Sequence, residues 1–377
     1  MGNNLSVSVV VPLYNAEKYI ADCLESILAQ TFKDFEVIVV DDCSTDNSCA
    51  IVESYIPKFD GQLALYHMEK NSGSGALPRN KGIILSQGEY IVFADADDMI
   101  TPTALEELYT LAKNYEAEVV YCEKHYKIND DGSGIHIGTG ADQNVKLVDK
   151  PTFETENLTE RVQKILQGKY RIPQWRKFVR RDFIFKYEIF FPHCKISEDD
   201  IWTYALVFYA KKFLRVPNVT YIYRLSETSI KLTPKTPQQV ISFWLNPIFF
   251  GLKTLDNFMS KLEFFQANLQ WRYAVLENFV CSRFSCALQS SFQLSSSEIY
   301  ETLQQTFGEN FGEHDVLISA LCTILIAQQK ISVINQEKLN QIVAQNQARI
   351  AELEKINREN VAYISELEKF IAESQRN

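Results

Sequence analysis

Residues 7–48 read VSVVVPLYNAEKYIADCLESILAQTFKDFEVIVVDDCSTDNS, and they carry the clearest indication of the fold class. The stretch begins and nearly ends with short runs of β-branched residues, at 7–11 and 36–40, which are typical of buried strands. Between these runs, residues 16–30 place apolar side chains at helical spacing. Strand, helix and strand in this order predict a βαβ unit, and therefore a parallel sheet.

The alternation of strand and helix signals continues to about residue 125. Further strands are predicted at 63–68, 90–94 and 118–124, and further helices at 46–56, 76–87 and 102–115. Repeated βα units are typical of an α/β domain of the nucleotide-binding type, with a Rossmann-like, mainly parallel sheet. Residues 129–150, rich in Gly, Asp and Asn, are predicted to form a surface loop or hairpin that borders the site. Mixed signals follow to residue 225, so we expect this domain to span 1–235.

The remaining chain is predicted to be helical. Helical signals with many aromatic residues dominate from 237 to about 330, which predicts a helical domain over 236–332. The tail then shows about five heptads of apolar residues, which predict a coiled coil over 333–377. Two heptad positions form the seam, one with Leu339, Leu353 and Leu367, the other with Val343, Ile350, Ile364 and Ile371.

Polar and aromatic residues modify this seam. Three asparagines interrupt it, as expected where register or oligomeric state is specified at a cost in stability; they are Asn346, Asn357 and Asn360. The apolar stripe is widened by Ile356, Tyr363 and Phe370 at a flanking position where a two-stranded coil prefers charges. We therefore expect a homo-trimer or homo-tetramer rather than a dimer, or partial docking of the tail on the body. A helix lying on a membrane surface is the alternative, disfavoured by the tail's nearly balanced charges.

Composition excludes several classes of protein. The 377 residues are 46% hydrophobic and 12% aromatic, as in folded globular proteins. The net charge of −10 argues against a general nucleic-acid binder, which needs clustered Lys and Arg. No run of 18 apolar residues and no secretion signal occur, so we expect no membrane span and a cytoplasmic protein, or one peripheral at the inner face of the membrane. The eight cysteines lack CxxC pairs and are expected to be reduced, buried thiols.

Polar residues follow the ends of three predicted strands, at 12–15 (PLYN), 41–48 (DDCSTDNS) and 95–98 (DADD). In an open parallel sheet the carboxyl ends of the strands converge, so these segments are expected to meet in one cleft. The three carboxylates of 95–98 repel one another, and a divalent cation with oxygen ligands, Mn²⁺ or Mg²⁺, would relieve the repulsion. The alternative for both acidic segments is that they form helix caps and turns.

Residues 9–48, 71–98 and 197–200 together resemble the inverting family 2 glycosyltransferases of the GT-A fold, over roughly residues 6–230. The resemblance implies a site for a UDP-sugar donor, with Asp42 and Pro12 at the uracil, Asp95 facing the ribose and the sugar, and Asp97 binding the metal. The full set that it implies at the nucleotide-sugar is Pro12, Tyr14, Asp42, Asn71, Arg79, Asp95 and Arg224. Asp98 is expected to be a cap or a support for the other two aspartates.

The resemblance also implies a catalytic base in the segment 196–202 (ISEDDIW). An inverting transfer needs a carboxylate that takes the proton of the acceptor hydroxyl, and Asp199 is the expected base, with Glu198 contacting the acceptor or orienting the site. Asp200 remains the alternative base, and acids favoured by a helix N-terminus explain one or two of the three without chemistry. Trp175 and Lys177 resemble a family segment near the acceptor region, with core packing and a solvated charge as their respective alternatives.

We therefore expect a metal-dependent inverting glycosyltransferase that moves a sugar from a UDP-sugar to a hydroxyl of a glycan or cell-surface polymer. Residues 70–82 (KNSGSGALPRNKG) look most like those of enzymes that build teichoic acid, capsule or O-antigen. Two alternatives remain: a non-catalytic module that binds nucleotide-sugar or acts as a coiled-coil scaffold, and nucleotidyl transfer to a sugar phosphate. Nucleotidyl transfer would require a Gly-rich phosphate-binding loop after the first strand, and residues 12–19 do not provide one.

Overall fold

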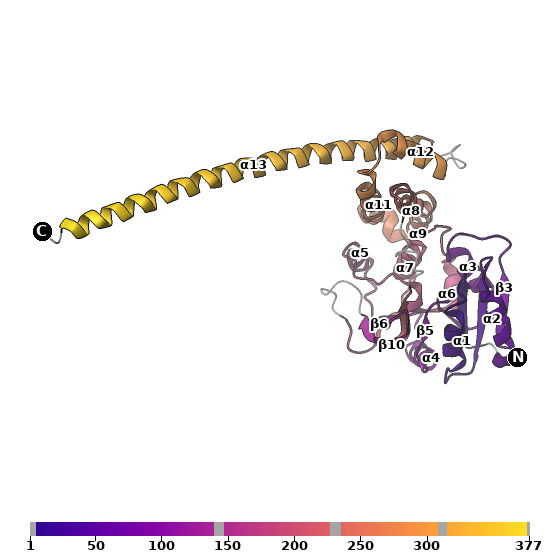
Figure 1. The fold of residues 1–377 in the computed structure, drawn as a ribbon. Coiled ribbons are helices and arrows are strands. Elements are labelled where there is room, and N and C mark those ends of the chain that lie inside the picture. Colours follow the sequence, from indigo (N-terminus) through magenta and orange to yellow (C-terminus); the bar gives the residue numbers. More distant parts are fainter. Residues whose placement is uncertain (1–4, 139–146, 227–234, 308–314, 375–377) are drawn as a thin grey trace. The chain divides into compact units, whose positions relative to one another are not determined.

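The computed structural model describes residues 5–138, 147–226, 235–307 and 315–374 (Figure 1). The chain divides into two compact units, Met1–Ala287 and Leu288–Asn377, which are considered separately below. Part of the hairpin predicted at 129–150, and parts of the tail, lie outside the described residues.

The first unit is built on one mixed sheet with the strand order β3-β2-β1-β4-β9-β6-β10-β5. Its first half is parallel and confirms the predicted strands: β1 Val7–Leu13, β2 Phe35–Asp41, β3 Leu63–His67 and β4 Tyr90–Phe93. In the second half, β6 and β10 are parallel, whereas β9 lies antiparallel between β4 and β6. The bounds there are β5 Met99–Ile100, β6 Val119–Asn129, β9 Lys177–Arg180 and β10 Phe213–Leu225. Two short strands pair at the margin, β7 His136–Gly138 on β6 and β8 Thr152–Phe153 on β10.

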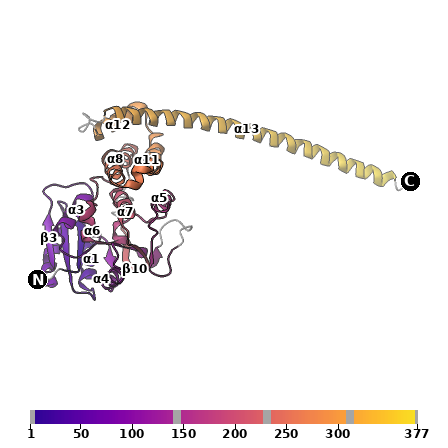
Figure 2. The ribbon, with the colours of Figure 1, turned by 180° about the vertical axis from the view of Figure 1, so that it is seen from behind.

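Alternate residues of the strands face two different cores, as the two-residue period of a strand requires. Val9 and Val11 belong to one core, together with helices α1 Ile20–Leu28, α2 Ser48–Tyr55 and α4 Ala104–Asn114. Val10 belongs to the other core, together with α3 Ala76–Leu85, α5 Leu158–Leu166, α6 Arg181–Tyr187 and α7 Glu198–Tyr209. The result is a three-layer α/β/α arrangement, seen from two sides in Figures 1 and 2. Short 3₁₀ turns are η1 Ile56–Phe59 and η2 Gln174–Arg176.

Helices follow the sheet, and most of them extend the second core. They are α8 Pro237–Phe250, α9 Leu252–Ser260, α10 Glu263–Ala267 and α11 Leu269–Ser291. Apolar side chains of α9, α10 and α11, such as Met259, Phe265 and Phe279, are buried in the same cluster as Trp202 of α7. The helical character predicted after residue 236 is confirmed, and α9, α10 and the part of α11 up to residue 287 share a core with the α/β layers.

The second unit contains α12 Ser296–Phe307 and α13 Asp315–Ser374, a single helix of 60 residues. Seam residues whose side chains are described are about half exposed, for example Leu339 at 52%, Ile350 at 56% and Leu353 at 51%. The coiled coil therefore stays a prediction, and the side chains of the seam from residue 362 onward lie outside the described set. In the described part of the chain, no helix is both long enough and apolar enough to cross a membrane.

Candidate active site

The turn after β4 holds three aspartates in different environments. Asp98 is 1% exposed and accepts hydrogen bonds from the Tyr221 hydroxyl (2.7 Å) and from the backbone N–H of Arg224 (2.8 Å). Burial, and then the charges of Asp97 and Asp95, raise the pKa of Asp98 well above its ordinary value. Asp98 therefore ties the turn to β10 and faces the interior, as expected for a support.

Asp95 and Asp97 remain accessible. Asp95 accepts hydrogen bonds from Gln174 Nε2 (2.8 Å) and from Arg79 Nη2 (2.9 Å), and its side chain is 25% exposed. One oxygen of Asp97 accepts a hydrogen bond from the hydroxyl of Ser226 (3.1 Å). Burial, followed by the nearby charge of Asp95, raises the pKa of Asp97. Two carboxylates whose charges are crowded and only partly balanced make a site at which a cation would be stabilised.

Arg79 connects this turn to a second acidic segment. It lies in the first turn of α3, is 8% exposed, and donates through Nη1 to Glu198 Oε1 (3.0 Å) as well as to Asp95. A Cβ at residue 75 would lie 2.7 Å from Arg79 Nη1, so the glycine at the start of α3 makes room for the guanidinium. One buried cation thus joins the carboxylates that follow β4 to those that begin α7.

The first turn of α7 carries Glu198, Asp199 and Asp200 after Ser197, which has a positive φ of 63°. Burial, then the charges of Glu198 and Asp200, raise the pKa of Asp199 to about 7. Asp200 instead forms an ion pair with Arg283 of α11 (2.8 Å). Asp199 forms no ion pair with any residue that the structure describes. The two aspartates are therefore distinguished by their partners, which the sequence did not show.

Lys177, for which a solvated charge was the alternative, is 1% exposed, so that interpretation is wrong. Its ammonium group donates to three consecutive carbonyls, those of residues 171–173, and to the hydroxyl of Thr203 in α7. Burial lowers the pKa of Lys177 well below its ordinary value. This contact fixes the segment that precedes Gln174 against α7. Trp175 stacks on Tyr221 with ring centroids 4.3 Å apart, in agreement with core packing.

The segments after β1, β2 and β3 lie together. Asp42 accepts hydrogen bonds from the backbone N–H and the hydroxyl of Ser72, both at 2.9 Å. Asn71 donates to the carbonyl of Asp42 (2.8 Å). Burial raises the pKa of Asp42. Tyr14 is 52% exposed, and Pro12 is the sixth residue of β1 and partly buried.

Residues 44–48 serve mainly to form the turn between β2 and α2. Ser48 accepts the N–H of Ala16 (2.8 Å), Asn15 accepts the N–H of Thr45 (2.7 Å), and Asp46 accepts the N–H of Ser48 (3.0 Å). The turn interpretation therefore holds for this part of the segment, although Asn47, the N-cap residue of α2, forms no side-chain cap hydrogen bond. Asp42 instead turns toward Ser72.

The guanidinium of Arg224 forms hydrogen bonds to three separate segments of the chain. Its N–H groups donate to Asp22 Oδ2 (2.7 Å), to the carbonyl of Asp130 (2.9 Å) and to the carbonyl of Asp97 (3.1 Å). The guanidinium therefore holds the β4 turn against α1 and against the end of β6. A direct contact with a pyrophosphate would use the remaining N–H groups of the guanidinium or exchange one of these bonds.

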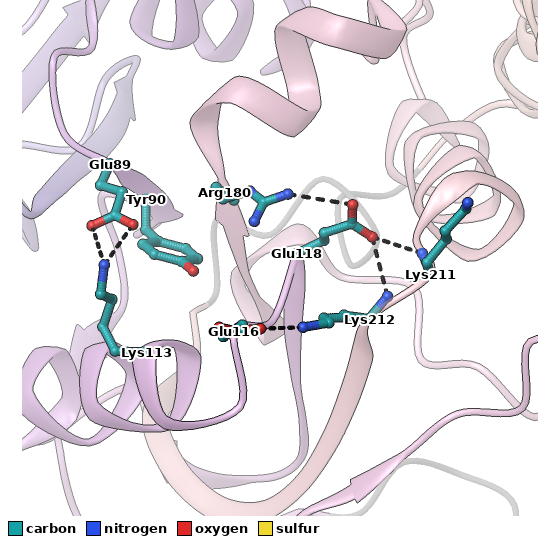
Figure 3. Close-up of a pocket in the computed structure, with 8 residues that line it drawn as sticks. All are labelled: Glu89, Tyr90, Lys113, Glu116, Glu118, Arg180, Lys211 and Lys212. Atoms are coloured by element: carbon teal, nitrogen blue, oxygen red, sulfur yellow. Dashed lines mark hydrogen bonds and ion pairs between the residues drawn. The ribbon is translucent and has the colours of Figure 1, made fainter.

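A hollow of about 380 Å³ lies elsewhere on the same sheet, and Figure 3 draws the residues that line it. It borders Tyr90, the first residue of β4, whereas Asp95 follows the last residue of that strand, so it lies at the opposite end. Lys113 pairs with Glu89 (2.9 Å) and Arg180 with Glu118 (3.3 Å) across its lining. These charges largely balance one another, and the hollow is separate from the candidate active site.

Sequence reasoning missed three residues of this site. Gln174 binds both oxygens of Asp95, Tyr221 binds Asp98, and Arg283 binds Asp200. Gln174 could have been found, since it directly precedes Trp175, which resembles part of a family segment near the acceptor region. Tyr221 and Arg283 carried no signal, because each acts across more than 80 residues of sequence.

Comparison with known proteins supports the same picture. The family described as Glycosyl transferase family 2 matches residues 8–185. The putative glycosyltransferase EpsH of Bacillus subtilis (strain 168) is 33% identical over 228 residues, which is 60% of this chain and 62% of EpsH. Glycosyltransferase GlyG of Streptococcus pneumoniae serotype 4 is 31% identical over 227 residues, 60% of this chain and 73% of GlyG.

A third relative connects sequence and structure. TarS of Staphylococcus aureus (strain MW2), a poly(ribitol-phosphate) beta-N-acetylglucosaminyltransferase, is 31% identical over 222 residues, 58% of this chain and 35% of TarS. The crystal structure of S. aureus TarS 1-349 in complex with UDP-GlcNAc superposes with a TM-score of 0.58 at 24% identity, over 79% of this chain and 81% of that one. This likeness confirms the expected fold of the α/β layers and the helices that follow them.

Proposed function

This chain belongs to glycosyl transferase family 2, and we propose that it transfers a sugar from a UDP-sugar to a hydroxyl of a glycan or cell-surface polymer, with inversion at the anomeric carbon. The observation that carries the proposal is Arg79, a buried cation that binds Asp95 on one side and Glu198 on the other. It joins the carboxylates expected at the donor to those expected at the acceptor. A module that only binds nucleotide-sugar has no need of that connection.

On the donor side, Asp42, Pro12, Tyr14 and Asn71 would form the nucleotide pocket, with the Asp42 carboxylate accepting the imide N–H of uracil. Ser72 now occupies that carboxylate, so binding of the base would share or replace this bond. Gln174 and Arg79 hold Asp95 in one orientation, in which its carboxylate would accept hydrogen bonds from hydroxyl groups of the ribose or the sugar.

Asp97 would hold the divalent cation. Its partly buried carboxylate, crowded by Asp95, offers the oxygen ligands that Mn²⁺ and Mg²⁺ prefer. Such an ion would balance the negative charge of the pyrophosphate as UDP leaves. Arg224 holds the backbone of Asp97 through its carbonyl and so supports this position. We propose that Arg224 contributes to nucleotide-sugar binding in this way.

Asp199 is the proposed base. The acceptor hydroxyl gives its proton to the Asp199 carboxylate while the hydroxyl oxygen forms a bond to the anomeric carbon, and the bond from that carbon to UDP breaks on the opposite face. An α-linked donor then gives a β-linked product. A pKa of about 7 suits this role, since about half of the group is ionised at pH 7 and its carboxylate is still basic enough to take a proton. Glu198, held by Arg79, would orient the acceptor.

The acceptor is proposed from the relatives. TarS is named for transfer to poly(ribitol-phosphate), and a repetitive polymer presents many equivalent hydroxyl groups. Half-exposed seam residues along α13 support assembly of this chain into a homo-trimer or homo-tetramer through residues 333–377. Several active sites on one assembly would then bind one polymer with raised effective concentration.

The donor screen tests the proposal. Release of UDP is measured for a panel of UDP-sugars with a polymer acceptor, with Mn²⁺ and with EDTA. We expect turnover with at least one donor, loss of turnover with EDTA, and a product anomer opposite to that of the donor. A parallel assay with UTP and a panel of sugar 1-phosphates measures pyrophosphate, and its release there would instead indicate nucleotidyl transfer. Absence of turnover with every donor, with unchanged UDP affinity in Asp97→Ala, would indicate a non-catalytic module.

A further inference from the structure

A second cluster of metal-ligating side chains lies outside the site described above. Asp41 is the last residue of β2, His67 is the last residue of β3, and Cys49 is the second residue of α2. Asp41 and His67 are register partners on parallel strands, and Asp41 Oδ2 lies 3.1 Å from His67 Nδ1. One ligand atom from each of the three residues lies within 4.8 Å of the other two. The fold thus brings three ligands from three elements to one point.

Hydrogen bonds, rather than a permanent cation, hold the carboxylate at this point. Asp41 is only 3% exposed, and among the described residues its one ion-pair partner is His67, whose side chain is 56% exposed and charged only when protonated. Its remaining neighbours are neutral donors, including the N–H of Ser44 (3.0 Å). Buried carboxylates are normally paired with a cation or bound to a metal. A bound cation would place a permanent positive charge beside this carboxylate.

The donor set selects the ion. A thiolate sulfur, an imidazole nitrogen and a carboxylate oxygen are the ligands of Zn²⁺, whereas Mg²⁺ and Mn²⁺ prefer oxygen throughout. Three protein ligands leave a fourth position for water. The exposed ring of His67 and the partly exposed Cys49 leave this position open to solvent.

We propose that Asp41, Cys49 and His67 form a binding site for Zn²⁺, separate from the Asp97 site and independent of the proposed sugar transfer. The ion would connect the ends of β2 and β3 to the first turn of α2. Asp42, the next residue, belongs to the nucleotide pocket proposed above, so the ion would stiffen one wall of that pocket. Zinc binding is therefore expected to raise the unfolding temperature of the whole chain.

Cobalt provides a specific probe, because Co²⁺ bound to a thiolate shows a near-ultraviolet charge-transfer band that oxygen ligands do not give. The full chain, reduced and stripped with EDTA, is titrated with Co²⁺ and then with Zn²⁺. The variants are Cys49→Ser and His67→Ala, with Cys43→Ser as the matched control. Cys43 is also partly buried and six residues away, and its thiol contacts the carbonyl of Met68.

We expect the band to saturate at one Co²⁺ per chain and to be displaced by Zn²⁺. It should be absent in Cys49→Ser, need at least tenfold more Co²⁺ in His67→Ala, and be unchanged in Cys43→Ser. Because the His67 ring is largely exposed, His67→Ala is expected to fold. This variant therefore tests the proposed site even if Cys49→Ser does not fold. No band in the unchanged chain, or a band of equal strength and affinity in both Cys49→Ser and His67→Ala, would overturn the proposal. Loss of sugar transfer alone would have no bearing on it.

Discussion

Asp200 and Arg283 form an ion pair with 2.8 Å between Oδ1 and Nη2, which joins the first turn of α7 to α11. Arg283 also donates from Nε to the hydroxyl of Ser197 (3.3 Å) and from Nη1 to the carbonyl of Phe279 (3.2 Å). One oxygen of Asp200 is therefore already engaged by Arg283. This difference supports the proposal that Asp199, which forms no ion pair among the described residues, takes the proton.

The pH dependence of transfer follows from this arrangement. Since the pKa of Asp199 is raised to about 7 and the base must be ionised, kcat/KM is expected to fall as the pH drops below about 7, with a one-proton slope. In Asp200→Asn a neighbouring negative charge is removed, so the pKa of Asp199 falls and the midpoint moves to lower pH. Initial rates of UDP release from pH 5 to 9 measure both. An unchanged midpoint in this variant would argue against Asp199.

Arg283 is expected to act as a positioning residue. Arg283→Gln leaves Asp200 without its cation, and breaking a buried pair costs on the order of 3 kcal/mol of unfolding free energy. The uncompensated charge should also raise the pKa of Asp199 and shift the pH midpoint upward. Arg272→Gln is the control, because Arg272 forms a similar pair with Asp256 on the more exposed side of the helices. A purely structural role would lower the unfolding temperature and leave the pH midpoint unchanged.

Substitutions of Asp97 and Asp98 are expected to have different effects, the first on metal binding and the second on the stability of the fold. Asp97→Asn should raise the Mn²⁺ concentration needed for half-maximal rate by about tenfold or more, a scale known for changes at metal sites. Asp98→Asn should leave that concentration nearly unchanged and lower the unfolding temperature, because the amide presents a donor where Tyr221 and Arg224 donate. Metal titrations and thermal unfolding of both variants check this. Equal effects on Mn²⁺ in the two variants would contradict the division.

Assembly through α13 is tested at the seam. Ile350→Asp combined with Leu353→Asp places two charges on the half-exposed apolar stripe and should convert a trimer or tetramer to monomers. Ala351→Asp, between them but off the seam, serves as the control. Native mass measurement of the full chain gives the subunit number directly. A monomeric unchanged chain would rule out the coiled coil as an oligomerisation segment.

The first half of the fold could be predicted from sequence because its strands are β-branched runs separated by helices of ordinary length. Val9 and Val10 face opposite cores as that pattern requires. The antiparallel strand β9 was not predicted, since its four residues, KFVR, carry no alternation of their own and obtain their place from pairing with β4 and β6.

The candidate site shows the same limit. The aspartates after β4 and at the start of α7 are visible as motifs, yet their different roles depend on distant partners. Tyr221 lies 123 residues from Asp98, and Glu198 lies 119 residues from Arg79. Lys177 looked like a surface charge because nothing near it in sequence shows that three backbone carbonyls enclose its ammonium group.

We propose that Asp199 takes the proton of the acceptor hydroxyl. The most direct test of this role compares Asp199→Asn with Asp200→Asn. With a donor that supports turnover, Asp199→Asn should lower kcat by about 100-fold to 10,000-fold, with UDP affinity kept. Its fold should be at least as stable as the unchanged chain above pH 7, since a raised folded-state pKa means that ionising Asp199 costs stability there. Asp200→Asn should retain most of the activity. Full activity in Asp199→Asn, or the larger loss in Asp200→Asn, would contradict the account.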